Sequence, residues 1–131
     1  KIMKKEEIFE VLKNVAEDAL DVDPEEVEMS SKLIGDLDAE SLDIIDLLFK
    51  AGKKIGVKLS MKEVQESIRG GLSEDDFFDD EGFVSVDGMK VLNNQFPNIS
   101  QDLPEKIRTK DLLKLLDMGY LVELFYTKVS E

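Results

Sequence analysis

One serine hydroxyl in the sequence stands where it could hold a phosphate group. Ser41 follows Glu40 and begins a stretch, residues 41–55, in which apolar side chains recur at helical spacing. The first turn of a helix leaves backbone N–H groups unpaired and carries the positive end of the helix dipole, so it favours a phosphodiester. The alternative is that Ser41 serves only as the helix N-cap, the commoner role of a serine before an apolar helix.

The residues on both sides of this serine extend the pattern. They form the run Asp36-Leu37-Asp38-Ala39-Glu40-Ser41-Leu42-Asp43, and a second segment, Glu105-Lys106-Ile107-Arg108-Thr109, follows far downstream. This combination resembles the acyl carrier proteins, whose modification site usually reads D-L-G-x-D-S-L-D before a hydrophobic helix. The resemblance implies that Ser41 carries a covalent 4'-phosphopantetheine arm, added by a phosphopantetheinyl transferase.

Two residues of the run differ from the usual family pattern. Asp38 stands in place of the glycine that follows Asp-Leu, and aspartate is among the few non-glycine residues that adopt left-handed backbone conformations. Glu40 stands in place of the aspartate before the serine, which keeps the negative charge and lengthens the side chain by one methylene group. We therefore expect Ser41 to remain a substrate for the transferase.

The resemblance also implies that partner enzymes read the helix that follows the serine. The residues expected at that interface are Asp36, Glu40, Leu42, Asp43, Ile45, Asp46 and Phe49. Its three apolar members have two interpretations. Apolar side chains on helices mostly pack inward, which favours the core. If they are exposed instead, they form an apolar patch around the attachment point.

Charge changes sign along this helix. Carboxylates precede and begin it, whereas Lys50, Lys53, Lys54 and Lys58 follow toward and beyond its end, and typical family members are acidic along the whole exposed side. Cations near a helix C-terminus complement its dipole, which is one explanation. The other is a different set of partners, because like charges across an interface disfavour binding. The sequence leaves both explanations open.

Composition limits the other functions. The chain has 131 residues, with 30 acidic and 17 basic side chains and a formal net charge of -13, so nucleic-acid binding is not expected. It has no histidine and no cysteine, which removes Ser-His-Asp triads, thiolate chemistry and the usual zinc sites. We expect a chain that is not an enzyme and whose partners present basic docking surfaces. By the resemblance, these partners are acyl or aminoacyl ligases, synthases and acyltransferases.

Helical spacing recurs along most of the chain. It predicts helices over residues 4–20 and 41–55, a short helix closed by Gly70 and Gly71, a helix over 86–96 and a last helix that starts near Lys110. A long loop is expected between the first two helices.

The acidic run 74–82 is predicted to be a solvated loop that attracts divalent ions only weakly. An EF-hand calcium loop with Gly82 as its glycine would cover residues 77–88, with Phe77 at the first ligand position and Gly88 at the twelfth. These are the two most demanding ligand positions, and neither residue can fill them. No metal site is expected.

These features predict an all-α fold, namely an acyl-carrier-type four-helix bundle with additional helices between helix two and the last helix. We expect one domain, residues 1–131, with an insertion at about 60–104 and a C-terminal extension at about 118–131. No stretch approaches the roughly 18 consecutive apolar residues of a membrane-spanning helix, so a cytoplasmic monomer without membrane insertion is expected.

By the resemblance, the function is that of an enlarged, specialised bacterial acyl carrier protein. It would hold an acyl group as a thioester on the arm at Ser41 and deliver it to enzymes of fatty-acid or specialised envelope-lipid biosynthesis. Two alternatives stay open. One is an aminoacyl carrier of the peptidyl or D-alanyl kind, which shares the serine-helix pattern, and the other is an unmodified helical interaction domain.

Overall fold

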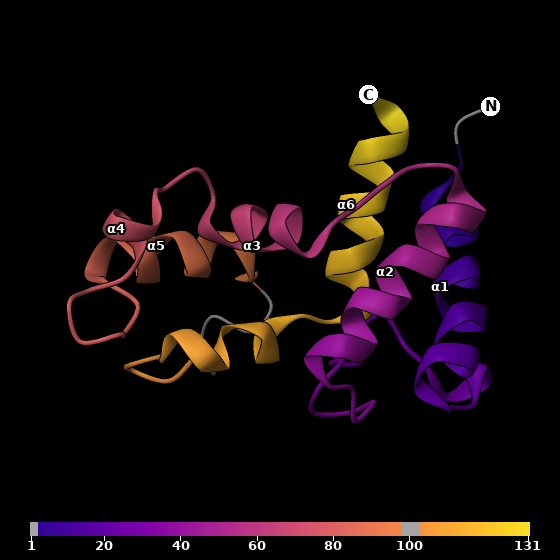
Figure 1. Cartoon of the computed structure of the whole chain (residues 1–131), viewed down its shortest axis with the longest axis horizontal. Helices are drawn as coiled ribbons and strands as arrows, with labels where there is room; N and C mark the ends of the chain where they lie inside the picture. The colour runs from indigo at the N-terminus through magenta and orange to yellow at the C-terminus, as the bar shows by residue number, and fades with distance from the viewer. Residues whose placement is uncertain (1–2, 98–102) are drawn as a thin grey trace. The chain divides into compact units, whose positions relative to one another are not determined.

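The computed structural model describes residues 3–97 and 103–131, and α-helices and short 3-10 helices are its regular elements (Figure 1). None of the helices in these residues is long and apolar enough to cross a membrane. The chain divides into two compact units: unit 1 consists of Lys1–Met61 and Leu116–Glu131, and unit 2 of Lys62–Leu115. The predicted all-α fold with additional helices before the last one is confirmed. The organisation as one domain with an insertion and an extension stays a prediction.

In unit 1, α1 (Lys5–Leu20) packs against α2 (Ser41–Ile55) and α6 (Met118–Ser130). The buried face of α1 repeats every three or four residues, close to the stripe that the sequence predicts, and consists of Ile8, Leu12, Val15 and Ala16. The helix ends at Asp21, whose left-handed backbone (φ 56°) turns the chain into the following loop.

The long loop between α1 and α2 is tied down by buried side chains. It begins with a 3-10 turn, η1 (Pro24–Glu26), whose N-cap Asp23 accepts the N–H of Glu25 at 3.0 Å. The buried apolar side chains of the loop are Val27, Leu33, Leu37 and Ala39. Leu37 and Ala39 lie just before α2, so their burial fixes the position at which the helix begins.

The second helix, α2, has the bounds that the sequence predicts. Its buried face comprises Ile44, Leu47, Leu48 and Ala51, as expected, and Ile55 is half-buried. Gly56 ends the helix in the left-handed region at φ 93°, where glycine has no steric penalty. A β-carbon on Gly52 would lie 2.6 Å from the carbonyl oxygen of Val57, so only glycine lets the chain fold back this closely.

The end of the chain differs from the prediction. The sequence pattern predicts one helix from about Lys110, but the structure has a 3-10 helix, η3 (Thr109–Leu115), and then the separate helix α6. The break lies at Leu116, because the chain is extended there and pairs with the loop that precedes α2. The Leu33 N–H donates to the Leu116 carbonyl at 3.1 Å, and the Lys32 and Asp117 backbones form an antiparallel bridge. Non-local pairing therefore overrides the local helical pattern.

A second helix start follows this break. Asp117 is the N-cap of α6, and its carboxylate accepts the N–H of Tyr120 at 2.8 Å. Gly119 lies in the first turn, where its N–H donates to the Met29 carbonyl at 2.8 Å. The helix contributes to the apolar interior through Met118, Leu121, Val122 and Phe125. The segment beyond residue 118 thus supplies a core helix of unit 1.

Unit 2 contains most of α3 (Met61–Arg69), together with α4 (Glu74–Phe77), α5 (Val86–Gln95) and η3. Gly70 and Gly71 close α3 in left-handed conformations, as the sequence predicts. The bounds of α5 also agree with the prediction to within one residue. The fully buried side chains of these three α-helices are Val64, Ile68, Phe77 and Leu92.

The acidic run 74–82 is only partly the predicted loop. Its first four residues form α4, because Ser73 caps them by accepting the Asp76 N–H at 3.2 Å. The rest is a turn in which one Asp79 carboxylate oxygen accepts the N–H groups of Glu81 and Phe83, at 2.9 and 3.0 Å. This carboxylate therefore holds the backbone of its own turn.

Candidate functional site

Ser41 is the first residue of α2 and lies on the surface. The N-cap is Glu40, whose backbone is extended (φ -99°, ψ 169°) and whose N–H donates to Asp43 Oδ2 at 2.9 Å. The carbonyl of Glu40 accepts the N–H of Ile44 at 3.1 Å, which starts the helical ladder. None of the other described residues hydrogen-bonds to the Ser41 hydroxyl. The N-cap interpretation of Ser41 is therefore wrong, and its hydroxyl is left accessible.

The loop ahead of the serine is held by its backbone. The Ala39 N–H donates to the Leu33 carbonyl at 2.9 Å, and the Leu37 N–H donates to the Lys32 carbonyl at 3.0 Å. Asp38, between the two buried residues, has a left-handed backbone with φ 58°. Aspartate thus adopts the conformation expected of the family glycine, which confirms the interpretation of this substitution.

One predicted interface residue has a structural role. Asp36 is exposed, and its Oδ2 accepts the N–H of Lys32 at 2.7 Å, while its own N–H donates to the Lys32 carbonyl at 3.0 Å. These two bonds close the turn that leads to the serine. The carboxylate of Asp36 therefore shapes the loop in addition to contributing charge.

Three apolar side chains of α2 are exposed beside the serine. Leu42 is 76% exposed, Ile45 47% and Phe49 63%, so the preference for placing them in the core is wrong. A helix that packs with one face buries one apolar stripe, and the stripe of α2 is already complete on the side of Ile44 and Leu48. The three residues, spaced by three and four positions, form a second stripe, here called the apolar patch, that runs away from Ser41 along the helix.

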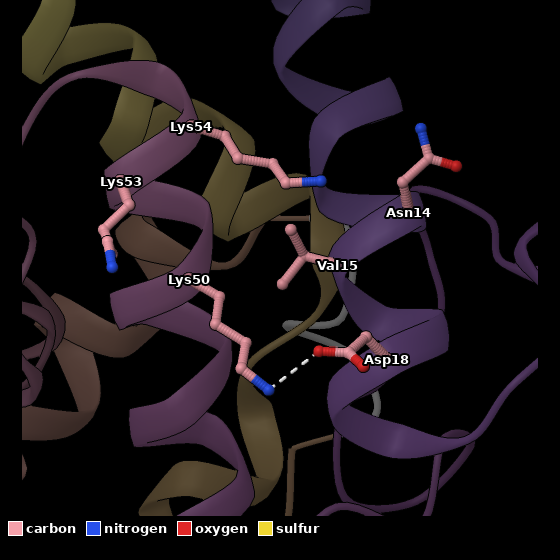
Figure 2. A pocket seen from close by; sticks show the side chains of 6 residues that line it. All are labelled: Asn14, Val15, Asp18, Lys50, Lys53 and Lys54. Atoms are coloured by element: carbon pink, nitrogen blue, oxygen red, sulfur yellow. Dashed lines mark hydrogen bonds and ion pairs between the residues drawn. The ribbon is translucent and has the colours of Figure 1, made fainter.

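The charges of α2 pair with one another and with α1. Lys50 Nζ lies 2.8 Å from Asp18 Oδ2 on α1 (Figure 2). It also lies 3.0 Å from Asp46 Oδ2 on its own helix. The hydrogen bond from Lys50 lowers the pKa of the Asp18 carboxyl, and the same bond is the main cause of the raised pKa of Lys50. Asp18 lies 32 positions before Lys50, and no local sequence signal indicates this contact.

A groove follows the apolar patch toward the end of α2. It has a volume of about 720 Å³, and its lining is mostly apolar. The lining residues come from the second half of α2 and the segment after it, and they are Ile45, Leu48, Phe49, Gly52, Lys53, Gly56, Val57, Lys58, Leu59, Ser60 and Met61. The sequence did not indicate this groove, because it depends on how the chain folds back at Gly52.

The surroundings of Ser41 fit a phosphopantetheine arm. The hydroxyl is exposed, and the first turn of α2 presents unpaired backbone N–H groups, which stabilise a phosphodiester. The neighbouring Glu40 side chain is exposed to water, which screens its repulsion of a phosphate. Within residues 3–97 and 103–131, no group of three or more His, Cys, Asp or Glu side chains is arranged to hold a metal ion.

Known proteins resemble the part of the chain that contains this site. The family model described as a phosphopantetheine attachment site matches residues 10–70. The acyl carrier protein of Coprothermobacter proteolyticus is 38% identical over 64 residues, covering 49% of this chain and 78% of that protein. The acyl carrier proteins of Petrotoga mobilis and Thermotoga maritima are 36% and 37% identical, covering 49% and 47% of this chain and 75% and 76% of theirs. No solved structure matches the chain.

The matched region includes α2 and the loop that precedes it, and the matched proteins are covered over more than two thirds of their length. Family membership implies a covalent 4'-phosphopantetheine on a serine, as well as interaction with a phosphopantetheinyl transferase and with enzymes that handle acyl groups. The chain belongs to the acyl carrier protein family.

Proposed function

We propose that the protein is an acyl carrier whose Ser41 bears the phosphopantetheine arm. When bound, the arm supplies a terminal thiol on which an acyl group is held as a thioester. The observation that carries this assignment is the exposed Ser41 hydroxyl, which neither caps α2 nor bonds to another described residue. The chain itself catalyses no reaction, and its acyl group goes to enzymes of fatty-acid or specialised envelope-lipid biosynthesis.

The residues around the serine give it a defined position. Glu40 and Asp43 cap the helix from either side of Ser41, and Asp36 closes the preceding turn. The serine is therefore held at the helix start without any use of its own side chain. Such a position lets a transferase approach the hydroxyl while the backbone around it stays fixed.

Partner enzymes would bind the surface next to the arm. The exposure of Leu42, Ile45 and Phe49 supports a role of the apolar patch in docking, because exposed apolar stripes rimmed by charge mark interaction sites. Glu40, Asp43 and Asp46 add carboxylates to the same end of α2, and these complement basic docking surfaces.

The assignment of the serine is tested by modification in vitro. Incubation with coenzyme A and a phosphopantetheinyl transferase should add one arm of about 340 Da, measured by intact-protein mass spectrometry. Ser41→Ala should gain no mass. Ser30 is also exposed, so Ser30→Ala is a matched control that should be modified like the wild type. Modification of Ser41→Ala, or failure of the wild type to gain mass, would contradict the assignment.

The nature of the cargo needs a separate measurement. Protein purified from its own host and treated with hydroxylamine should release a hydroxamate of a fatty acid, because hydroxylamine cleaves thioesters. An amino-acid hydroxamate would instead indicate the aminoacyl carrier. A native protein that bears no arm would favour the unmodified interaction domain.

A further inference from the structure

Three lysines at the end of α2, Lys50, Lys53 and Lys54, line a pocket beside α1 together with Asn14, Val15 and Asp18 (Figure 2). Lys50 and Lys54 reach toward α1, where Lys50 bonds to Asp18, whereas the end of the Lys53 side chain points away from α1. Lys53 and Lys58 line the apolar groove. Within residues 3–97 and 103–131, neither of these two has a carboxylate oxygen within ion-pair distance. Among the described residues, these two exposed cations at the groove thus form no ion pair, although the chain has a net charge of -13.

The helix dipole does not account for both of them. Its effect falls off within the last turn, so it explains a cation at Lys53. Lys58, however, lies two residues beyond Gly56, which ends the helix. The carbonyl of Gly52 is already satisfied by the N–H groups of Gly56 and Val57, at 2.8 and 3.1 Å. Lys58 therefore lies beyond the last turn, where the dipole effect has fallen off, and for this residue we favour the explanation by a different set of partners.

Lys53 lies beside Phe49, the aromatic residue of α2. Lys53 Nζ lies 5.2 Å from the centroid of the Phe49 ring, and that ring is 63% exposed. Phe49 belongs both to the apolar patch and to the lining of the groove. The apolar surface is therefore continuous from Leu42, next to the serine, to the groove. Its charges are negative at the Ser41 end and positive at the groove end.

We propose that this groove binds a partner protein that inserts an apolar side chain beside Phe49 and places carboxylates against Lys53 and Lys58. The same partner would face the acidic end of α2 with basic residues, so complementary charge fixes the direction in which it lies along the helix. A second copy of this strongly acidic chain is disfavoured as the occupant by repulsion. A hydrocarbon cargo is also disfavoured as the occupant, because it has no negative charge to pair with the ammonium groups of Lys53 and Lys58.

The proposal can be tested on the full chain with Ser41 unmodified, so that its failure leaves the assignment of the serine untouched. The probes are two helical peptides of about 15 residues with identical leucine anchors, one flanked by glutamates and the other by lysines. The glutamate peptide should shift the NMR amide resonances of Phe49, Lys53 and Val57. The affinity of K53E/K58E for the glutamate peptide should be about tenfold lower than that of the wild type, because attraction between exposed charges becomes repulsion. Its affinity for the lysine peptide should rise for the same reason.

K90E/K110E is the matched control, because both lysines are exposed and the change in net charge is the same. K90E/K110E should lower the affinity for the glutamate peptide far less than K53E/K58E does. Two results with the unmodified chain would overturn the proposal: equal effects of the two double variants, or shifts that lie outside the groove. A separate sample, in which Ser41 carries an arm loaded with an octanoyl group, gives a third: loss of peptide binding there would make cargo the occupant of the groove. Concentration-dependent dimerisation that K53E/K58E abolishes would assign the groove to a second copy and would also refute it.

Because the variants could perturb the fold, K53Q/K58Q serves as a second test. Glutamine keeps most of the side-chain length and removes only the charge. Its affinity for the glutamate peptide should lie between those of the wild type and K53E/K58E. Equal affinity of K53Q/K58Q and the wild type would show that charge does not contribute, and the proposal would fail.

Discussion

The backbone N–H of Glu40 donates to Asp43 Oδ2 at 2.9 Å, across the residue that bears the candidate hydroxyl. This bond pairs a donor at the start of α2 with a side chain one turn ahead, as the second half of a capping box does. Ser41 lies between Glu40 and Asp43 in the sequence, and its side chain takes no part in this bond. The helix start is thus capped by Glu40 and Asp43, and the Ser41 hydroxyl is left for modification.

Stability and modification should therefore separate in two variants. Ser41→Ala should change the free energy of unfolding by less than about 0.5 kcal/mol, since an exposed residue that makes no hydrogen bond is removed. Asp43→Ala should cost about 0.5–1 kcal/mol, because it removes the acceptor of the Glu40 N–H. Urea unfolding followed by circular dichroism measures both. A larger loss in Ser41→Ala than in Asp43→Ala would mean that the serine, after all, holds the helix start.

Gly52→Ala should be more harmful than an ordinary glycine replacement in a helix. The new β-carbon would lie 2.6 Å from the carbonyl oxygen of Val57, and a backbone atom cannot move aside cheaply. We expect a loss of roughly 1–3 kcal/mol in unfolding free energy, as in other overpacked sites. The same variant should shift the NMR resonances of the groove residues, because it displaces the segment that lines them.

Gly35→Ala is the control for this prediction. A β-carbon there would meet only the Lys32 β-carbon, at 3.9 Å, which is ordinary contact. Alanine also reduces the conformational entropy of the unfolded chain. The stability of Gly35→Ala should equal or slightly exceed that of the wild type. Similar losses in the two variants would show that the close approach at Gly52 is relieved at little cost.

Local sequence signals were sufficient to predict the bounds of α2, but they did not predict the break between η3 and α6. The bounds of α2 follow from its apolar spacing and from Gly56, both of which are read within a few residues. The break before α6 depends on backbone pairing between Leu33 and Leu116, which are 83 positions apart. A helical pattern of leucines continues across that break, so spacing alone predicts one helix.

The candidate site was predictable to a similar degree. The motif predicted the start of a helix at Ser41 and the left-handed backbone of Asp38, because each depends on adjacent residues. The exposure of Phe49 was not predictable, since it depends on which faces of α2 the other helices cover. The contact from Asp18 to Lys50 and the groove at Gly52 likewise arise only when distant or folded-back segments meet.

The pair formed by Asp18 and Lys50 predicts a titration. The hydrogen bond from Lys50 lowers the pKa of the Asp18 carboxyl below its ordinary value of 3.8. A carboxyl with a depressed folded-state pKa stabilises the fold above its unfolded pKa, and this contribution is lost as the pH falls through the folded value. NMR titration of the side-chain carboxyl carbons should therefore place Asp18 below 3.8.

Lys50→Gln provides the comparison for Asp18. Glutamine removes the positive charge, so the pKa of Asp18 should rise toward its ordinary value. Because both side chains reach water, the accompanying change in stability should be small and should shrink further at high salt. An Asp18 pKa that does not respond to Lys50→Gln would show that the contact is not formed in solution.

Asp117 should respond to pH in the opposite sense. Its carboxyl is half-buried, and this burial raises its pKa above the ordinary value of 3.8, although the N–H of Tyr120 and the charge of Lys32 act in the other direction. The folded state therefore binds the proton more tightly than the unfolded state does. It follows that the contribution of Asp117 to stability is greatest at low pH and falls as the pH rises through the interval between the two pKa values.

Two variants of Asp117 separate its charge from its role as a cap. Asp117→Ala should lose about 1 kcal/mol, because the Tyr120 N–H loses its acceptor. Asp117→Asn keeps an N-cap oxygen and carries no buried charge, so its stability relative to the wild type should improve from pH 3 to pH 7. Urea unfolding of the three proteins at both pH values measures these differences. The other carboxyl groups are the same in all three proteins, so their titration cancels in the comparison. If Asp117→Asn instead lost stability relative to the wild type as the pH rose, the charged carboxylate would be favourable at the helix start, and the raised pKa would be refuted.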